Sequence, residues 1–382
     1  MNAPRLSWAE VRSRRLERHG LATPAPDAAP AGVVAAMAGT HAQVMSAAEL
    51  AVGLRIDGAT RTAVREALWT DRTLVKTFGP RGTVHLLPAA DLGLWVGGLS
   101  AVPPMPGAAA PPGIRMTPEQ TERVIDSIGA ALAEDGGDLT IDELSDAVVE
   151  RAGPWAGDLV MPAFQGMWPR WRQALPEAGT RGLLCFGPNR GRKVTYRAPR
   201  DLRPEPVIAA LAFLVRSYLH AYGPSTPRRF AHWLAAPASW ATELFTTLDA
   251  DLQQVIVEGN PEWVWSGDTA APSGPPRGVR LLPYFDGYAY RVGNQPPALL
   301  YPGKAADRVL PGNFQILLVD GEVAGLWHQR RSGRRLALTV EPLVTLTRTQ
   351  RADLDDQVER VGHILEGRPE MTIGTVTVGG HA

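Results

Sequence analysis

The chain has 382 residues, of which 45% are hydrophobic and 20% are charged, a composition typical of a folded protein rather than a disordered one. No apolar run approaches the length of a membrane span, and the arginine-rich residues 1–18 lack the apolar stretch of a secretory signal. Cys185 is the single cysteine, which excludes an internal disulfide and a cysteine-based zinc site. We expect a cytoplasmic protein of two to four domains.

The 39 basic and 39 acidic side chains balance to a formal net charge of zero, so their distribution is more informative than their sum. Acidic residues are concentrated between positions 126 and 150, and basic residues near 190–197 and 330–335. An acidic back and a basic face would permit phosphate binding by local counterion release. Ordinary surface charge explains each cluster equally well.

The first third of the chain predicts short helices followed by a β-hairpin. Ser46 and Glu49 have the spacing of a capping box, which predicts a helix start soon after a stop at Gly39. The turn at residues 79–82 interrupts an alternating pattern, as the turn of a hairpin does. The predicted elements are helices over residues 33–38, 46–55 and 61–69 and strands over residues 74–78 and 83–87.

A second helix–hairpin unit follows a linker rich in proline and glycine at residues 103–113. Thr117 and Thr140 each precede a glutamine or glutamate by three residues, which predicts two capped helices. The other predicted elements are a tryptophan-containing helix over residues 162–175 and hairpin strands over residues 182–186 and 193–197.

The pattern recurs a third time and then becomes mostly β. Ser225-Thr226-Pro227 predicts a helix start, because a hydroxyl cap precedes proline at the first helical position. Asp320 and Gly321 lie between two apolar segments, which is a strong signal for a type I′ hairpin turn. The predicted elements are helices over residues 207–222, 239–248 and 354–365 and strands over residues 252–258, 263–265, 316–319, 323–327 and 335–340.

Helices followed by a β-hairpin are the pattern of a winged helix, and three such units in tandem indicate a protein that lies along duplex DNA. The predicted fold class is therefore α+β, with three tandem winged helix-turn-helix units forming a concave DNA cradle and a β-rich C-terminal portion. The predicted domains are residues 1–105, 106–200, 201–275 and 276–382, the last packing with the third winged helix.

Between the Gly39 stop and the next helix lies a polar motif, His41-Ala42-Gln43. In an extended segment, residues i and i+2 point to the same side, so the imidazole and the amide can hold one water while Ala42 packs inward. The plainer interpretation of this spacing is a histidine at a helix end beside a glutamine bonded to backbone.

Such weak polar groups suffice only where the leaving group is already activated. A purine alkylated at N7 or N3 is positively charged, and its glycosidic bond breaks through an oxocarbenium-like sugar. The protein then needs only to place a water and to stabilise the cation electrostatically. Gln43 can orient the water through its carbonyl oxygen, and His41 can accept a proton from it.

Several longer segments share the pattern of one family, namely residues 38–44, 67–69, 72–77, 81–88, 218–224, 282–286 and 319–327. Through them the chain resembles the AlkZ-like and YcaQ-like winged-helix DNA glycosylases over nearly its whole length. The resemblance implies three winged helices that cradle duplex DNA, monofunctional removal of bulky alkylated purines, and unhooking of interstrand crosslinks. Some members of the family protect antibiotic producers from their own DNA-alkylating product.

The family's catalytic motif is a glutamine, a hydrophobic residue, and then glutamine or aspartate. Ala42 and Gln43 match the last two positions, whereas His41 replaces the first glutamine. The departure leaves two possibilities open: retuned chemistry with a genuine base, or a DNA-binding scaffold that has lost the reaction. We favour retention, because histidine can form the hydrogen bonds that the first glutamine forms.

Basic side chains on the predicted hairpins are candidate DNA contacts. Each has a plainer interpretation, which is incidental surface charge or, for His85, a satisfied and partly buried ring. Asp286 could stabilise an oxocarbenium ion, although an aspartate before glycine is more often structural. The candidate DNA-binding residues are Lys76, Arg81, His85, Arg190, Arg192, Lys193, Arg330 and Arg331.

The sequence predicts no metal site and no cofactor, since the eight histidines show no ligand spacing with carboxylates. A Schiff-base lyase step needs a lysine at the motif, and none lies there, which favours a monofunctional hydrolase. We expect a monomer associated with the nucleoid, with no membrane and no obligate protein partner.

The predicted function is a DNA glycosylase for alkylated purines, in repair or in self-resistance to a genotoxic natural product. The alternatives are a non-catalytic winged-helix DNA-binding protein or transcription regulator, and a protein–protein scaffold without salt-dependent DNA affinity.

Overall fold

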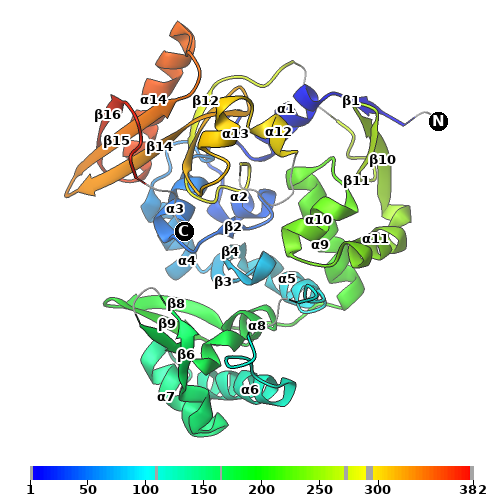
Figure 1. The fold of residues 1–382 in the computed structure, drawn as a ribbon, viewed down its shortest axis with the longest axis vertical. Coiled ribbons are helices and arrows are strands. Elements are labelled where there is room, and N and C mark those ends of the chain that lie inside the picture. The colour runs from blue at the N-terminus through cyan, green and yellow to red at the C-terminus, as the bar shows by residue number, and fades with distance from the viewer. Residues whose placement is uncertain (1–2, 108–110, 164–165, 271–273, 290–295, 379–382) are drawn as a thin grey trace.

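The computed structural model describes residues 3–107, 111–163, 166–270, 274–289 and 296–378. The protein has the expected α+β character: helices and hairpins follow one another in three segments, and a five-stranded sheet with one long helix comes last (Figure 1). None of the helices in these ranges is long and apolar enough to cross a membrane.

The first segment carries the polar motif on a short strand beside a hairpin. Its sheet has the order β2-β4-β3, so the second hairpin strand lies between the first and the motif. The predicted hairpin is confirmed to within one residue. The elements are α2 (Pro30–Ala36), β2 (Thr40–His41), α3 (Met45–Gly53), α4 (Arg61–Trp69), β3 (Leu74–Phe78), β4 (Val84–Pro88) and α5 (Leu92–Leu99).

The capping box predicted at Ser46 is wrong. Helix α3 begins one residue earlier, and its N-cap residue Val44 makes no side-chain hydrogen bond. Glu49 is 1% exposed and forms ion pairs with Arg61 and Arg65 of α4. A buried carboxylate needs compensating charge. Glu49 therefore forms ion pairs with α4 instead of the capping interaction that the local pattern predicts.

The second segment confirms both predicted capping boxes, in which Thr117 and Thr140 exchange hydrogen bonds with Gln120 and Glu143. Its hairpin β8–β9 is also confirmed, but the first strand begins three residues later than predicted and extends to Arg190. The elements are α6 (Pro118–Asp135), β5 (Leu139–Thr140), α7 (Ile141–Ala152), β6 (Leu159–Pro162), β7 (Met167–Pro169), α8 (Leu175–Thr180), β8 (Cys185–Arg190) and β9 (Lys193–Arg197).

The helix predicted over residues 162–175 is wrong. Strands β6 and β7 pair there as a hairpin, and α8 begins only at Leu175. Pro169 lies inside the predicted helix and lacks the amide hydrogen that a helix interior requires. Residues 164–165 of that prediction, and residues 108–110 of the predicted linker, lie outside the described residues.

The third segment confirms its three predicted helices and its hairpin, and Thr226 caps the second helix through the amide of Arg229. The N-terminus joins this segment, because β1 pairs in parallel with β10, whereas the predicted domain of residues 1–105 places it with the first segment. The elements are β1 (Arg5–Leu6), α1 (Trp8–Arg18), α9 (Val207–Tyr222), α10 (Pro227–Leu234), α11 (Ala238–Thr247), β10 (Leu252–Val257) and β11 (Asn260–Trp265).

The C-terminal region is a five-stranded sheet in the order β12-β13-β14-β15-β16. Asp320 and Gly321 have φ angles of 48° and 80°, which confirms the predicted I′ turn. The last helix begins earlier than predicted, because Thr347 and Gln350 form a capping box. The elements are β12 (Val279–Leu282), α12 (Pro297–Leu300), α13 (Lys304–Arg308), β13 (Gln315–Val319), β14 (Glu322–Ser332), β15 (Arg335–Pro342), α14 (Arg348–Ile364) and β16 (Arg368–Ile373).

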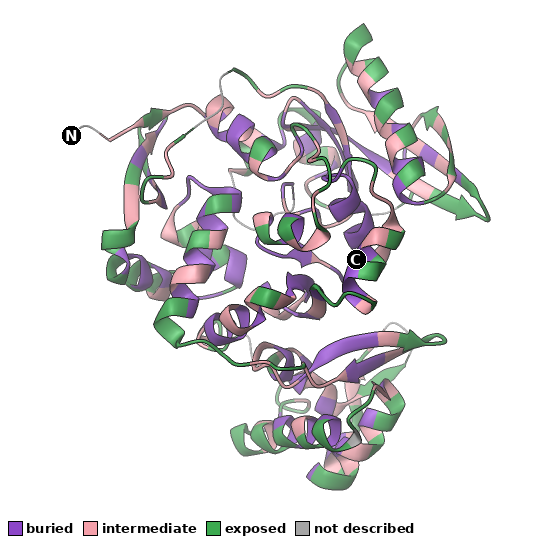
Figure 2. Cartoon of the chain, turned by 180° about the vertical axis from the view of Figure 1, so that it is seen from behind, coloured by how far each residue is buried: buried purple, intermediate pink, exposed green. Residues whose placement is uncertain are grey.

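The first segment lies at the centre of the molecule (Figure 1). The core of the C-terminal sheet includes Leu50 and Leu54 of α3, so this region packs on the first segment. The sequence-based expectation placed it against the third winged helix. The helices of the third segment share a different core with Leu87 and Trp95. Viewed from behind, the ends of hairpins β8–β9 and β14–β15 are exposed, while their bases are buried (Figure 2).

Candidate active site and DNA contacts

The motif begins in strand β2 with His41 and leaves it at Ala42, and Gln43 lies in the bend before α3. His41 lies opposite His85 in the β2–β4 ladder, and the amide of Ala42 donates a hydrogen bond to the Val84 carbonyl at 2.7 Å. Ala42 is fully buried, whereas His41 is half-buried and Gln43 is exposed. This alternation leaves the amide of Gln43 accessible to substrate and solvent at the start of α3.

His85 supplies a second imidazole beside the motif. Its ring centroid lies 5.3 Å from that of His41, in an edge-to-face arrangement, and Nδ1 lies 2.9 Å from the Thr83 carbonyl oxygen. Burial, followed by the charges of Arg81 and His41, holds the pKa of His85 well below 6.5. Because a carbonyl only accepts, Nδ1 of the neutral ring carries the proton and Nε2 presents a lone pair.

The ring of His85 fits beside the hairpin turn because position 79 is a glycine. A Cβ added at Gly79 would come within 2.8 Å of the His85 ring, closer than packed atoms approach. His85 is 4% exposed. The structure therefore assigns it to the interior beside His41, not to the surface where a DNA contact was expected.

A second buried histidine, His19, also has a lowered pKa. His19 is 1% exposed, and burial together with the nearby charge of Arg55 lowers its pKa to about 3. In the unfolded chain both histidines bind a proton as the pH falls, whereas in the folded protein both rings stay neutral. Their stabilising contribution is complete above the ordinary histidine pKa and is lost as pH falls toward the folded-state pKa.

We expect the free energy of unfolding to decrease as pH falls from about 6.5 to about 5, by about 1.4 kcal/mol per pH unit for each of the two histidines. Urea unfolding at several pH values measures the slope. The substitutions His85→Asn and His19→Asn should each reduce this slope by the contribution of one histidine, about 1.4 kcal/mol per pH unit. An unchanged slope in both variants would contradict the assignment of these buried, neutral rings.

An aromatic turn that the sequence analysis did not assign to the site completes the surroundings of His41. The ring of Phe285 lies 4.5 Å from that of His41, with the planes inclined by 44°. Tyr284 lies next to it, with ring centroids 6.2 Å apart. Residues 282–286 share the family's pattern and Asp286 is a candidate site residue, but two consecutive aromatic residues before an Asp-Gly turn do not reveal a partner more than 240 positions away.

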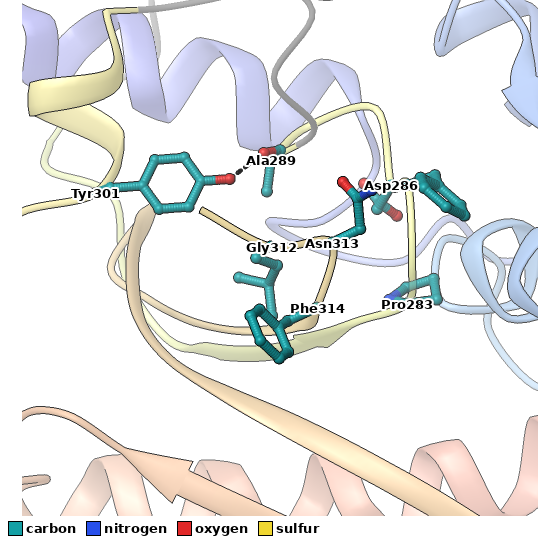
Figure 3. Close-up of a pocket in the computed structure, with 9 residues that line it drawn as sticks. Pro283, Asp286, Ala289, Tyr301, Gly312, Asn313 and Phe314 are labelled. Atoms are coloured by element: carbon teal, nitrogen blue, oxygen red, sulfur yellow. Dashed lines mark hydrogen bonds between the residues drawn. The ribbon is translucent and has the colours of Figure 1, made fainter. Parts of the chain in front are cut away.

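Phe285 also lines a small pocket between the turn and the C-terminal sheet. Figure 3 shows Asn313 directed across it toward Asp286, with Tyr301 donating a hydrogen bond to the Ala289 carbonyl at 2.7 Å. The lining residues are Pro283, Phe285, Asp286, Ala289, Tyr301, Gly312, Asn313, Phe314 and Ile316.

Asp286 has a structural partner. Its carboxylate accepts hydrogen bonds from both terminal nitrogens of Arg55, at 2.9 and 2.8 Å, and another from the amide of Tyr288 at 3.1 Å. The side chains of Arg55 and Asp286 are no more than 1% exposed. A carboxylate saturated in this way holds the turn in place, which favours the structural interpretation over a role at an oxocarbenium ion.

Lys76 lies in a groove between the first and second segments. Its Nζ is 4.9 Å from the centroid of the Phe186 ring on β8, and burial lowers the pKa of this lysine. Arg72, Arg197 and Arg200 also line the groove, and none of its described lining residues is acidic. Arg197 pairs with Asp138 at 2.8 Å, so the ammonium of Lys76 and the side chains of Arg72 and Arg200 are the groove's candidates for binding phosphate.

Arg81 joins the first and third segments. Its guanidinium donates a hydrogen bond to the carbonyl oxygen of Trp233 at the end of α10, at 2.7 Å. The residue is half-buried and has a φ of 63° in the turn between β3 and β4. The structure therefore gives this predicted DNA contact a protein partner.

The basic hairpin β8–β9 lies beside acidic residues rather than on an opposite face. Arg190 pairs with Glu143 at 2.8 Å, and Lys193 pairs with Asp142 at 2.6 Å. The expected separation of charge is wrong here because β5 pairs with β9, which brings the start of α7 to the hairpin. These pairs are exposed to solvent and therefore weak, so a phosphate can compete with the carboxylates. Arg192 is exposed beside the turn.

The two arginines predicted on the C-terminal hairpin differ in their surroundings. Arg331 donates hydrogen bonds to the carbonyl oxygens of Leu365 at 2.7 Å and Glu366 at 3.2 Å, where they follow the last turn of α14. It therefore satisfies acceptors at a helix end. Arg330 is exposed on β14.

Within the ranges that the structure describes, no three histidine, cysteine, aspartate or glutamate side chains lie together as metal ligands would.

The family model for AlkZ-like DNA glycosylases matches residues 34–364. The chain belongs to the AlkZ-like DNA glycosylase family. An interstrand DNA cross-link repair glycosylase from Streptomyces sahachiroi is 31% identical to this chain in an alignment of 338 residues that covers 84% of this chain and 87% of the relative. The solved structure of Streptomyces sahachiroi DNA glycosylase AlkZ matches with a TM-score of 0.78 at 26% identity, covering 97% of this chain and 100% of that one.

The family resemblance inferred from sequence is confirmed, and this AlkZ-like protein is a DNA N-glycosylase that acts on DNA. The matched region contains the motif, the hairpin β3–β4 and the aromatic turn at Phe285. In this AlkZ-like protein these parts meet around His41.

Proposed function

We propose that this enzyme is a monofunctional glycosylase that hydrolyses the N-glycosidic bond of alkylated purines in duplex DNA. The substrates we propose are bulky N7-guanine or N3-adenine adducts, with interstrand crosslinks among them. The exposed amide of Gln43, two residues after His41 and just before α3, is the observation that carries the proposal. The biological role would be repair or self-resistance to a genotoxic natural product.

The chemistry requires few protein groups because the alkylated purine is a cationic leaving group. As the bond from C1′ to the purine nitrogen breaks, its electron pair neutralises the base. Water attacks C1′, oriented by the amide oxygen of Gln43, and releases a proton to His41. The products are the free alkylated base and an abasic site.

A monofunctional reaction accords with the lysine positions. The chain has only Lys76, Lys193 and Lys304. The Nζ of Lys76 is directed toward Phe186 of the second segment, and Lys193 pairs with Asp142. These contacts give neither amine a role as a Schiff-base nucleophile at the motif.

For the DNA-bound form we propose that each of the three segments is a winged helix and that together they form a concave cradle. The order of elements supports this, since helices precede a hairpin in each segment. The phosphate contacts we propose are Lys76, Arg190, Arg192, Lys193 and Arg330. Arg81, His85 and Arg331 act instead through the protein contacts described above. We further propose that the enzyme works as a monomer on nucleoid DNA.

The direct test is release of free base from duplex DNA carrying small or bulky N7-alkylguanine, measured chromatographically against DNA incubated without enzyme. Release by the wild-type protein in excess of spontaneous depurination supports the proposal. Salt-dependent DNA binding without release of either adduct would overturn it and would indicate that this substrate class is wrong.

Arg192, which is exposed at the tip of hairpin β8–β9, gives a prediction for DNA binding. Arg192→Ala is expected to reduce the slope of log K against log salt concentration by about 0.9, because one phosphate contact is lost. The melting temperature should not change, since the side chain is exposed. Fluorescence anisotropy at several salt concentrations measures the slope.

Arg151→Ala is the matched control for this measurement. Arg151 is a cation of the same segment, but it pairs with Glu134 between helices α6 and α7. Its removal should leave the salt dependence unchanged. Equal slopes for wild type and Arg192→Ala would remove the hairpin tip from the proposed DNA contact surface.

A further inference from the structure

The turn that brings Phe285 to His41 has an unfavourable backbone. Phe285 has a φ of 60°, in the left-handed region, where residues with a Cβ are disfavoured and bulky ones are true outliers. Such a conformation persists only where the surroundings over-determine it, and it is concentrated at functional sites. The contacts that impose this backbone are therefore informative.

The ion pair between Arg55 and Asp286 is the main constraint on the turn. Two hydrogen bonds tie the Asp286 carboxylate to the guanidinium, which also donates to the Ala51 carbonyl of α3 at 2.7 Å. Helix α3 is the element that follows the motif directly. The helix that begins beside Gln43 thus holds the residue next to Phe285.

A second constraint comes from the third segment. A Cβ at Gly287 would come within 2.6 Å of the Tyr222 hydroxyl, and that hydroxyl donates a hydrogen bond to the Met37 carbonyl at 3.0 Å. The turn therefore lies against α9 with no room for a side chain at position 287. Contacts on both sides leave Phe285 little freedom to relax its backbone.

As a result, two aromatic rings lie against the imidazole of His41. Phe285 lies against the ring of His41 at 4.5 Å, and His85 meets the same ring edge-on at 5.3 Å from the neighbouring strand. A ring confined in this way loses rotational freedom about χ1 and χ2. Placing one water for attack requires this kind of orientation, since small displacements lower rates sharply.

We propose that Phe285 is a positioning residue, whose strained backbone, imposed by the Arg55–Asp286 pair, fixes the ring plane of His41 for catalysis. The proposal rests on the proposed function only for its kinetic consequence. The orientation of His41 in the free protein is a separate and directly measurable property.

Phe285→Gly is the decisive variant, because it removes the ring and also relieves the unfavourable φ. We expect a folded protein with a melting temperature close to that of the wild type and a kcat for release of N7-alkylguanine lowered about 10- to 100-fold, with KM for DNA little changed. Phe285→Leu should lie between the two, and Phe285→Tyr should restore most of kcat. A merely structural role predicts that activity follows stability instead.

Side-chain NMR of histidine in the DNA-free enzyme provides the readout that needs no activity. In the wild type the His41 ring protons should show ring-current shifts from Phe285, and these should collapse in Phe285→Gly. Phe314→Leu is the matched control, because Phe314 lines the same pocket but packs beside Arg308; it should leave the His41 signals in place.

The possible outcomes distinguish failure of the positioning role of Phe285 from failure of the proposed glycosylase substrate. Unchanged His41 signals in Phe285→Gly, or a folded Phe285→Gly enzyme with wild-type kcat, would overturn the positioning role. If the wild type releases no alkylated base while Phe285→Gly alters the His41 signals, the proposed substrate is wrong and the positioning of His41 by Phe285 stands.

Discussion

Gln43→Ala will give a folded protein that releases alkylated purines about 10²- to 10⁴-fold more slowly than the wild type, the range associated with loss of a group that handles water and its proton. The reason is that no other side chain in the motif can present an amide oxygen to the attacking water. Stability should be unaffected, because Gln43 is exposed. Single-turnover base release, with thermal unfolding in parallel, measures both quantities.

Substitutions at His41 distinguish a proton acceptor from a hydrogen-bonding group. His41→Ala should lower the rate as strongly as Gln43→Ala. His41→Gln restores the family's first residue, so it should retain part of the rate while losing the rise in activity as an imidazole deprotonates, since glutamine does not titrate. The pH dependence of single-turnover rates is the measurement.

Two results would contradict this assignment. If His41→Ala and Gln43→Ala both keep wild-type rates, the motif is not the reaction centre. If His41→Gln reproduces both the rate and the pH profile of the wild type, histidine acts only by hydrogen bonding, and the departure from the family pattern has no effect on proton transfer.

The second large effect concerns stability. Asp286→Ala is expected to lower the free energy of unfolding by about 3–5 kcal/mol, because it leaves the guanidinium of Arg55 buried without its carboxylate. Both side chains are at most 1% exposed, so water cannot replace the lost partner. Urea unfolding measures the change.

The exposed pair Arg335–Glu370 of the C-terminal sheet is the matched control. Its side chains are 64% and 57% exposed, and Glu370→Ala should cost only about 0–1 kcal/mol. Replacing both partners, as Arg55→Met with Asp286→Leu, should recover much of the stability lost in Asp286→Ala. Equal losses for Asp286→Ala and Glu370→Ala would show that the buried pair does not anchor the turn.

Predictions succeeded where the deciding interactions are local. The caps at Thr117, Thr140 and Thr226 form between residues three positions apart, and the I′ turn at Asp320-Gly321 depends on the φ angles of two neighbours. Alternation of side chains along an extended segment likewise placed Ala42 inward. A window of a few residues contains all the information that these features need.

Two predictions failed because distant residues competed with the local pattern. Ser46 and Glu49 have the spacing of a cap, yet Arg61 and Arg65 hold the glutamate. The acidic residues near the start of α7 were expected on a separate face, yet pairing of β5 with β9 brings them to the basic hairpin. In both cases the alternative partner became available only when separate elements packed together.

The sequence by itself determined the helices, the hairpins, the family resemblance and the chemistry available to His41-Ala42-Gln43. Only the tertiary structure decided what surrounds His41. Phe285 and the Arg55–Asp286 pair, whose members are 231 positions apart, leave no periodic or spacing signal, because a long-range contact constrains two residues and none between them. The physical reason is burial: charges and rings far apart in the chain meet where packing excludes water, and that place is set by the whole fold.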